Sequence, residues 1–195
     1  RNWHFMLGTI FDNGAYLVVR HNNHFDRIDD PFRVGGVTVD PGDYRFHDTS
    51  VSFNSDQSRR FYYRLNVQPA TFYGGDRTDY SADIGFRLTS QLAAGAGFSR
   101  NDVSIPNGDF VADIGSFQVD YAFSPTVSLR SLTQYNSLSD QWSTSARLRY
   151  IFRPGSDIYV VYDEVRRDTR IAVDPFVNEF RDRQLVIKMT YLFSF

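Results

Sequence analysis

The sequence has no cysteine among its 195 residues, which excludes disulfide frameworks, cysteine-based zinc sites and thiol nucleophiles. It also has no run of about 18 consecutive apolar residues, the length that a transmembrane helix needs. Positive charge is not in excess either: the formal net charge is -2, whereas nucleic-acid binding requires a concentrated basic surface. We therefore expect no nucleic-acid partner, and a membrane-spanning version of this chain would cross with strands.

Aromatic residues are abundant instead. Phe (18) and Tyr (12) supply most of an aromatic content of 16%, while charged residues still make up 23% of the chain. The mean hydropathy is -0.39. This combination is unusual for a soluble core and is typical of a surface that is apolar on one face and hydrated on the other. The length is that of one domain, so we treat residues 1–195 as part of a single domain.

The clearest strand pattern is at the end of the chain, over residues 184–195. Successive side chains of a strand point to opposite faces, so residues two apart share a face. One face of this segment is continuously apolar, and the other carries Gln184, Lys188, Thr190 and Ser194. The apolar face consists of Leu185, Ile187, Met189, Tyr191, Phe193 and Phe195.

The same two-residue period recurs upstream and predicts about eleven strands, with no competing helical period. Clear strands are expected at 61–67, 80–88, 117–123, 127–135 and 142–152, and weaker ones at 3–11, 15–25, 44–53, 92–100 and 157–166. Within 44–53 the aromatic residues Tyr44 and Phe46 are out of phase with Val51 and Phe53. This phase change predicts a β-bulge.

The connections between these strands alternate in length. Short ones are expected at 12–14, 54–58, 89–91, 124–126 and 154–156, and longer ones at 29–43, 73–78, 102–109, 137–141 and 167–181. Outer-membrane β-barrels have short periplasmic turns and longer extracellular loops. The pattern therefore predicts an antiparallel transmembrane β-barrel with its C-terminus in the periplasm.

The strand number has a further consequence. An even-stranded barrel has both termini in the periplasm, whereas about eleven strands that end there begin outside. A barrel leaves no unpaired edge in lipid. We therefore expect at least one further strand upstream of Arg1, and we interpret the chain as the C-terminal part of a longer protein.

Several ordered stretches resemble one known family, the domain of unknown function that forms the C-terminal part of large bacterial proteins beginning with a carbohydrate-binding family 9-like module. These stretches are FYGGDR (72–77), GFSRNDV (97–103), YAFSP (121–125), QYNS (134–137), RLRYIFRPGSD (147–157) and YLF (191–193). The resemblance covers the chain from about Asp30 onward. It implies that a sugar-binding-like module precedes Arg1, and it implies no particular chemistry.

The last aromatic residues also resemble a targeting signal. Tyr191, Phe193 and Phe195 look like the C-terminal signal by which the outer-membrane assembly machinery recognises its barrel substrates. We therefore expect that machinery, together with outer-membrane lipid and lipopolysaccharide, among the partners of the protein, with other membrane-complex subunits as further candidates.

Strand geometry argues against other kinds of site. The polar segment 21–26 contains His21 and His24, but residues three apart on a strand point to opposite faces and do not converge on a metal. His47-Asp48 near Ser50 lacks the motifs of a hydrolase. The neighbouring carboxylates 163 and 164 face opposite ways, and the acidic segments 74–79 and 106–109 have the composition of ordinary turns.

The charged residues that alternate with apolar ones form the main candidate site. With the apolar side chains facing lipid, a set of charged side chains faces inward, as the polar lumen of such barrels requires. This set is Arg64, Arg87, Arg130, Arg147, Arg149, Lys188, Asp83, Asp120 and Asp163. A hydrated, salt-bridged interior without selectivity explains it, and so does a basic wall that attracts anions.

We predict an outer-membrane β-barrel that acts as a pore or transport channel, or as the membrane anchor of an upstream module; the sequence leaves both open. No catalytic residues, metal ligands or cofactors are expected, and we do not expect an enzyme. Two alternatives from other classes are a soluble carbohydrate-binding, lectin-like module and a barrel-borne surface hydrolase. A sandwich buries its apolar faces as a core, whereas here the apolar face is aromatic and recurs to the end of the chain.

Overall fold

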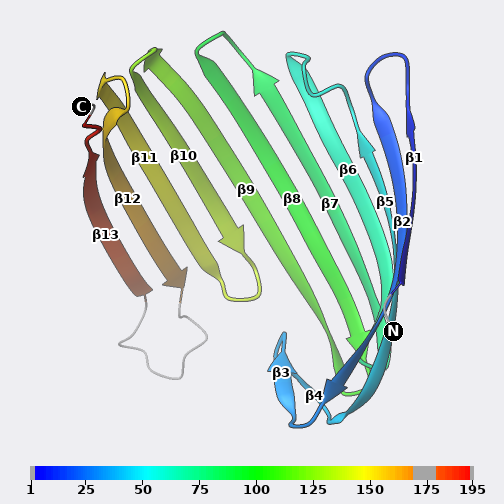
Figure 1. The fold of residues 1–195 in the computed structure, drawn as a ribbon. Helices are drawn as coiled ribbons and strands as arrows, with labels where there is room; N and C mark the ends of the chain where they lie inside the picture. The colour runs from blue at the N-terminus through cyan, green and yellow to red at the C-terminus, as the bar shows by residue number, and fades with distance from the viewer. Residues whose placement is uncertain (1–2, 169–178, 194–195) are drawn as a thin grey trace. The chain divides into compact units, whose positions relative to one another are not determined.

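The computed structural model describes residues 3–168 and 179–193, and all regular structure in these ranges is β-strand (Figure 1). The strands are β1 (Trp3–Ile10), β2 (Tyr16–Ile28), β3 (Phe32–Val34), β4 (Val37–Val39), β5 (Gly42–Asn54), β6 (Phe61–Phe72), β7 (Gly75–Arg87), β8 (Leu92–Ile105), β9 (Gly108–Ser124), β10 (Val127–Asn136), β11 (Gln141–Arg153), β12 (Ser156–Asp168) and β13 (Glu179–Thr190). Within these described ranges, no helix is long and apolar enough to span a membrane.

Eleven strands form one sheet in the order β1-β2-β5-β6-β7-β8-β9-β10-β11-β12-β13, and β3 pairs with β4 as a separate two-stranded sheet. Apart from the step from β2 to β5 across that hairpin, each strand lies beside the next one in the chain, as short connections between antiparallel strands require. The prediction of an all-β protein with about eleven antiparallel strands is confirmed.

All five predicted short connections join neighbouring strands. The turn between β5 and β6 shows how one is held: the backbone N–H and hydroxyl of Ser58 donate to Asp56 at 2.9 and 2.7 Å. These hydrogen bonds, with a smaller contribution from Arg59, lower the pKa of the Asp56 carboxyl. An Asp that bonds its own backbone two residues on is a common device for closing a turn.

Two of the predicted longer loops are wrong. β6 and β7 are joined only by Tyr73 and Gly74, and β8 and β9 only by Pro106 and Asn107. Both Tyr73 and Gly74 have positive φ angles, 43° and 83°, as a two-residue hairpin turn of type I′ requires. The polar residues around these turns belong to strands that extend further than the apolar pattern, and exposed strand ends have the same composition as loops.

The sheet is divided into two compact units, one of residues 1–84 with 97–114 and one of residues 85–96 with 115–195. In the second unit β10, β11, β12 and β13 pair in register. One face of these strands is apolar: Leu148 lies between Leu129 and Val160, and Val160 lies opposite Ile187. The other face is polar and carries Arg147 and Arg149. We call these the apolar face and the polar face.

The first unit has the same two faces. Val51 of β5 lies opposite Val19 and Val67 on its apolar face. On the polar face, Asn54 and Ser50 of β5 are 4% and 6% exposed. The side chains of Ser52 and Asn66 are joined there by a hydrogen bond of 2.6 Å. In this unit polar side chains are buried on one face while large apolar side chains remain exposed on the other.

The predicted bulge in β5 is wrong. The register between β2 and β5 is unbroken from Tyr16↔Asn54 to Ile28↔Gly42. Tyr44 and Phe46 lie on the polar face instead, because that face has apolar neighbours at this end of the strand: Tyr44 packs against the cluster of the β3–β4 hairpin. Phe46 packs against the rings of Phe72 and Tyr73. The phase change in the sequence therefore arises because the two ends of β5 have different neighbours, and not because a residue is inserted. A register irregularity does occur elsewhere, between Ile151 and Arg153 of β11.

The last strand begins and ends five residues earlier than the predicted segment 184–195. β13 ends at Thr190, and residues 191–193 continue without regular pairing. Leu185, Ile187 and Met189 share the apolar face, since they lie opposite Tyr162, Val160 and Ile158 of β12.

Candidate functional site

Arginine side chains gather on the polar face of the second unit. Arg87, Arg130, Arg147 and Arg149 line an open hollow with a volume of about 540 Å³, and Asp120 also lines it. Arg130 and Arg147 are direct register partners on β10 and β11, which brings two positive charges together across one strand pair. We call this site the arginine hollow.

Arg149 and Arg130 have carboxylate partners. The Nε and Nη2 atoms of Arg149 donate to Oδ2 of Asp157 at 3.0 and 2.7 Å, and its guanidinium lies 5.4 Å from the centroid of the Tyr159 ring. Arg130 forms an ion pair with Asp120. Such contacts fix the two guanidinium groups in place.

Arg147 differs from Arg130 and Arg149. It is exposed, and among the described residues it has no hydrogen-bond or ion-pair partner. It lines the hollow beside both paired guanidinium groups, since Arg130 lies opposite it on β10 and Arg149 lies two residues along β11. An anion that entered the hollow would therefore meet Arg147 without displacing a protein carboxylate.

The remaining predicted charges lie elsewhere on the polar faces. Lys188 is the register partner of Tyr159, and Asp163 is the partner of Ser145. Neither is among the residues that line the arginine hollow. In the first unit Arg64 lies 3.9 Å from Asp83 and donates to Oδ1 of Asn54 at 2.8 Å. The structure thus brings five of the nine predicted residues into one hollow and joins two others in an ion pair.

A buried polar network, not anticipated from the sequence, occupies the polar face of the first unit. Asp48 is 7% exposed and accepts hydrogen bonds from Asn22 at 2.7 Å and Gln68 at 3.1 Å. Arg77 forms an ion pair with Asp79 at 3.0 Å. A buried carboxylate is costly unless it is hydrogen-bonded, and Asn22 and Gln68 supply hydrogen bonds to the Asp48 carboxylate. The signal in the sequence is the two-residue period of amide and carboxylate residues that face one another across strands.

The histidines do not converge. His21 is bonded to Thr49 at 2.8 Å on the apolar-face side, whereas His24 stacks on Phe46 with centroids 4.6 Å apart on the other face. His47 and Asp48 are neighbours on β5 and also point to opposite faces. In residues 3–168 and 179–193 there is no group of three or more histidines and carboxylates placed to hold a metal ion.

Beyond the end of β13, the aromatic residues Tyr191 and Phe193 contact one another, and Tyr191 contacts residues at the end of β11. The Tyr191 ring lies 6.2 Å from Phe152 and 4.6 Å from Phe193, and the Arg153 guanidinium lies 4.8 Å from the Tyr191 centroid. Phe193 is 71% exposed. Phe195, the third member of the predicted signal, lies outside the described residues.

No family model matches the chain, and no curated protein matches it. Among solved structures, the chain is similar to the NanC porin, with a TM-score of 0.46 and 10% identity over 98% of this chain and 93% of that one. It is also similar to the KdgM porin solved in complex with disordered oligogalacturonate, with a TM-score of 0.41 and 13% identity over 99% of this chain and 92% of that one.

Proposed function

We propose that this chain is the C-terminal part of a bacterial outer-membrane β-barrel pore, in which the apolar face contacts lipid and the polar face lines an aqueous lumen. The observation that carries the proposal is an inverted distribution of burial. Phe117 and Leu65 are 54% and 46% exposed, while Asn54 and Asp48 are buried. A soluble lectin-like sandwich does the opposite, because its apolar faces form its core.

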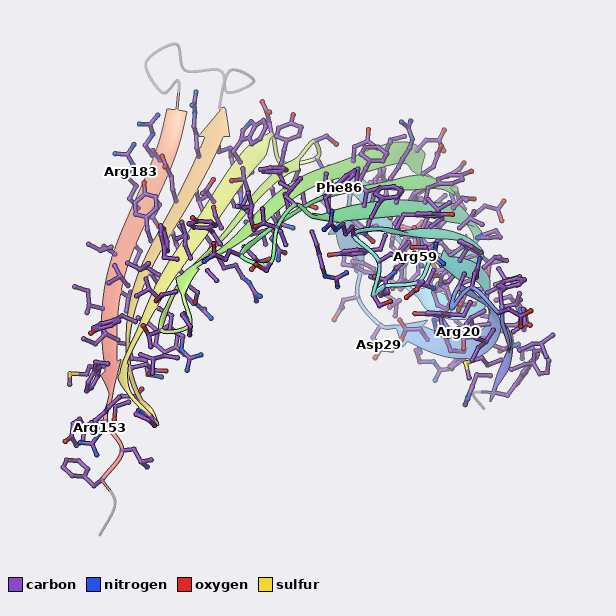
Figure 2. The ribbon with its side chains drawn as sticks, turned by 90° about the horizontal axis from the view of Figure 1, so that it is seen from above. Arg20, Asp29, Arg59, Phe86, Arg153 and Arg183 are labelled. Atoms are coloured by element: carbon purple, nitrogen blue, oxygen red, sulfur yellow. The ribbon has the colours of Figure 1, made fainter. Side chains whose placement is uncertain are left out.

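The length of the apolar stretch fits a bilayer. On β11 the apolar face runs from Trp142 to Tyr150, nine residues, and a tilted transmembrane strand needs about 9–11. Charged residues follow at both ends. Figure 2 shows Arg183 and Arg153 near opposite ends of β11 to β13, with apolar side chains between them. Arg183 forms an ion pair with Glu164 at 3.2 Å, level with Thr144, so on β12 and β13 the apolar face ends at Tyr162 and Leu185.

The arginine hollow supports a preference of the pore for anions. Four arginines and one aspartate line it, and Arg147 has no partner among the described residues. In a confined aqueous space these charges act on passing ions within a Debye length of about 8 Å at physiological salt. Rings of Arg or Lys favour anions in pores.

A protein in the outer membrane would have several partners there. Outer-membrane lipid and lipopolysaccharide surround the apolar face, and the assembly machinery recognises Tyr191, Phe193 and Phe195. From the family resemblance we also infer a carbohydrate-binding family 9-like module upstream of Arg1, which the sequence of the full-length protein tests directly.

Reversal potentials of the full-length protein in planar bilayers under a salt gradient test the function. The wild type should prefer anions, and Arg147→Gln should reduce that preference. Arg45→Gln is a matched control, since Arg45 lies on the opposite face of β5 from Phe46 and Asp48. Cation preference contradicts the basic-lumen reading, and absence of conductance rejects the pore and leaves a membrane anchor.

A further inference from the structure

The segment between β2 and β5 is not a loose loop. Strands β3 and β4 form a hairpin with Gly35 and Gly36 at its turn, where φ is 58° and 86°. Two consecutive positive φ angles define a type I′ turn, which glycine adopts without strain. Gly35 also lies against the Phe110 ring, where a Cβ would collide. The hairpin is therefore a defined element.

One face of this hairpin is apolar and packs against residues of the main sheet. Register places Phe32 opposite Val39 and Val34 opposite Val37, so all four share a face. Val39 forms a buried cluster with Val103 of β8 and Ile105. The side chains packed around that cluster are Phe32, Val34, Val37, Tyr44, Phe72, Tyr73 and Phe110. Burial raises the pKa of the Tyr73 hydroxyl, and the charge of Asp26 adds to the effect.

Polar contacts fasten the hairpin to a neighbouring turn. Asn107, between β8 and β9, donates from Nδ2 to the carbonyl oxygen of Thr38 and to Oδ2 of Asp40, both at 2.9 Å. Tyr44 donates to the carbonyl oxygen of Asp40 at 2.8 Å. The hairpin is thus held both by an apolar cluster and by hydrogen bonds at its base.

The covered surface belongs to the polar face of the first unit. Along β5, Tyr44 and Phe46 alternate onto the same face as Asp48 and Asn54, and all of these residues lie in one unit. The hairpin therefore lies over one end of the face that, under the proposed function, lines the lumen. Figure 1 shows β3 and β4 at the end of the strands where the β6–β7 and β8–β9 turns lie.

Because side chains alternate along a strand, the residues between the buried ones form the outward face of the hairpin. Arg33 lies between Phe32 and Val34 on β3 and pairs in register with Thr38, so its side chain points away from the buried cluster. It is exposed, and among the described residues it has no ion-pair partner. Other charges stand near the base of the hairpin: Asp29 and Asp30 precede it and are exposed.

We propose that the β3–β4 hairpin is a fixed constriction at one mouth of the pore and that Arg33 is a selectivity-determining residue held there. This inference rests on the proposed function. It adds a cationic position in the first unit to the arginine hollow of the second unit.

Charge reversal in planar bilayers tests the proposal. In water, a unit charge about 5 Å from a permeating ion changes its local concentration roughly fourfold before screening, so Arg33→Glu should lower the anion-to-cation permeability ratio about threefold or more. Arg45→Glu makes the same change of net charge on the opposite face and should leave the ratio unchanged. An unchanged ratio in Arg33→Glu, or an equal change in both variants, overturns the role of Arg33 while a conducting wild type keeps the pore.

A second measurement addresses the constriction itself. The chain has no native cysteine, so Arg33→Cys introduces a single thiol into it. Modification of that thiol with a bulky, negatively charged thiosulfonate should reduce single-channel conductance, and the same treatment of Arg45→Cys should not. Full conductance after complete modification of Arg33→Cys overturns the constriction. A wild type without conductance overturns the proposed pore, and the constriction with it.

Discussion

Arginine substitutions on the apolar face of β11 should lower the free energy of unfolding by an amount that depends on the depth of each residue in the membrane. The apolar face of this strand runs from Trp142 to Tyr150, and Ala146 lies at its centre. Leu148 and Tyr150, at 38% and 46% exposure, lie two and four residues further along the same face. Arg147 lies beside them on the polar face and serves as the position for a control.

The expected magnitudes follow from strand geometry. At about 3.3 Å per residue and a tilt near 40°, Leu148 lies about 5 Å and Tyr150 about 10 Å from the level of Ala146, within an apolar band about 25 Å tall. Arginine costs about 2–4 kcal/mol at the midplane and about 0–1 kcal/mol near the interface. We therefore expect about 2–4 kcal/mol for Ala146→Arg, about 2 kcal/mol for Leu148→Arg and at most about 1 kcal/mol for Tyr150→Arg.

The assay is reversible unfolding of the full-length protein from phospholipid bilayers by a chemical denaturant, with the free energy of unfolding extrapolated to zero denaturant. Arg147→Ser should change it by less than about 0.5 kcal/mol, as substitutions away from buried partners usually do. Arg149→Ser is a poorer control because Arg149 is bonded to Asp157. Equal destabilisation by Leu148→Arg and Arg147→Ser, or a larger effect at Tyr150 than at Ala146, would refute the assignment of the faces.

Two further predictions concern location and assembly. The full-length protein should partition with outer membranes and resist extraction by salt or carbonate, because large apolar side chains are exposed on β6, β7, β8, β9, β11 and β13; intact native protein in the soluble periplasmic fraction contradicts this. Insertion should depend on the terminal aromatics, so Phe193→Ser combined with Phe195→Ser should lower the amount of inserted barrel, measured against Ser194→Ala as control. Insertion of the double variant at the wild-type level would show that these residues are not the signal.

Local patterns in the sequence determine much of this protein. The two-residue period identifies the eleven strands, because alternation of side chains is a property of the strand itself. Turn residues such as Gly14 and Gly155, with φ of 82° and 77°, mark the short connections for the same local reason. The faces of Arg147, Arg149 and Leu148 follow directly from these two patterns.

Other features depend on neighbours that are distant in the sequence. The phase of Tyr44 and Phe46 suggests a bulge until their neighbours are known, which are the hairpin cluster for Tyr44 and the rings of Phe72 and Tyr73 for Phe46. Periodicity in the sequence reflects the environment of a face and does not reveal what creates it. The lengths of β7 and β8 were underestimated because exposed strand ends and loops have the same composition. The pairing of Arg149 with Asp157 depends on side-chain geometry that no spacing encodes.

The sequence by itself determined the strand order, the alternation of faces and the set of charges on the polar face, because each follows from local geometry and chain connectivity. Only the tertiary structure decided which of those charges share a hollow, which are neutralised by a carboxylate, and that residues 32–39 fold onto the sheet with Arg33 turned outward from the cluster. These are properties of contacts between residues far apart in the chain, where packing and hydrogen bonding outweigh local preference.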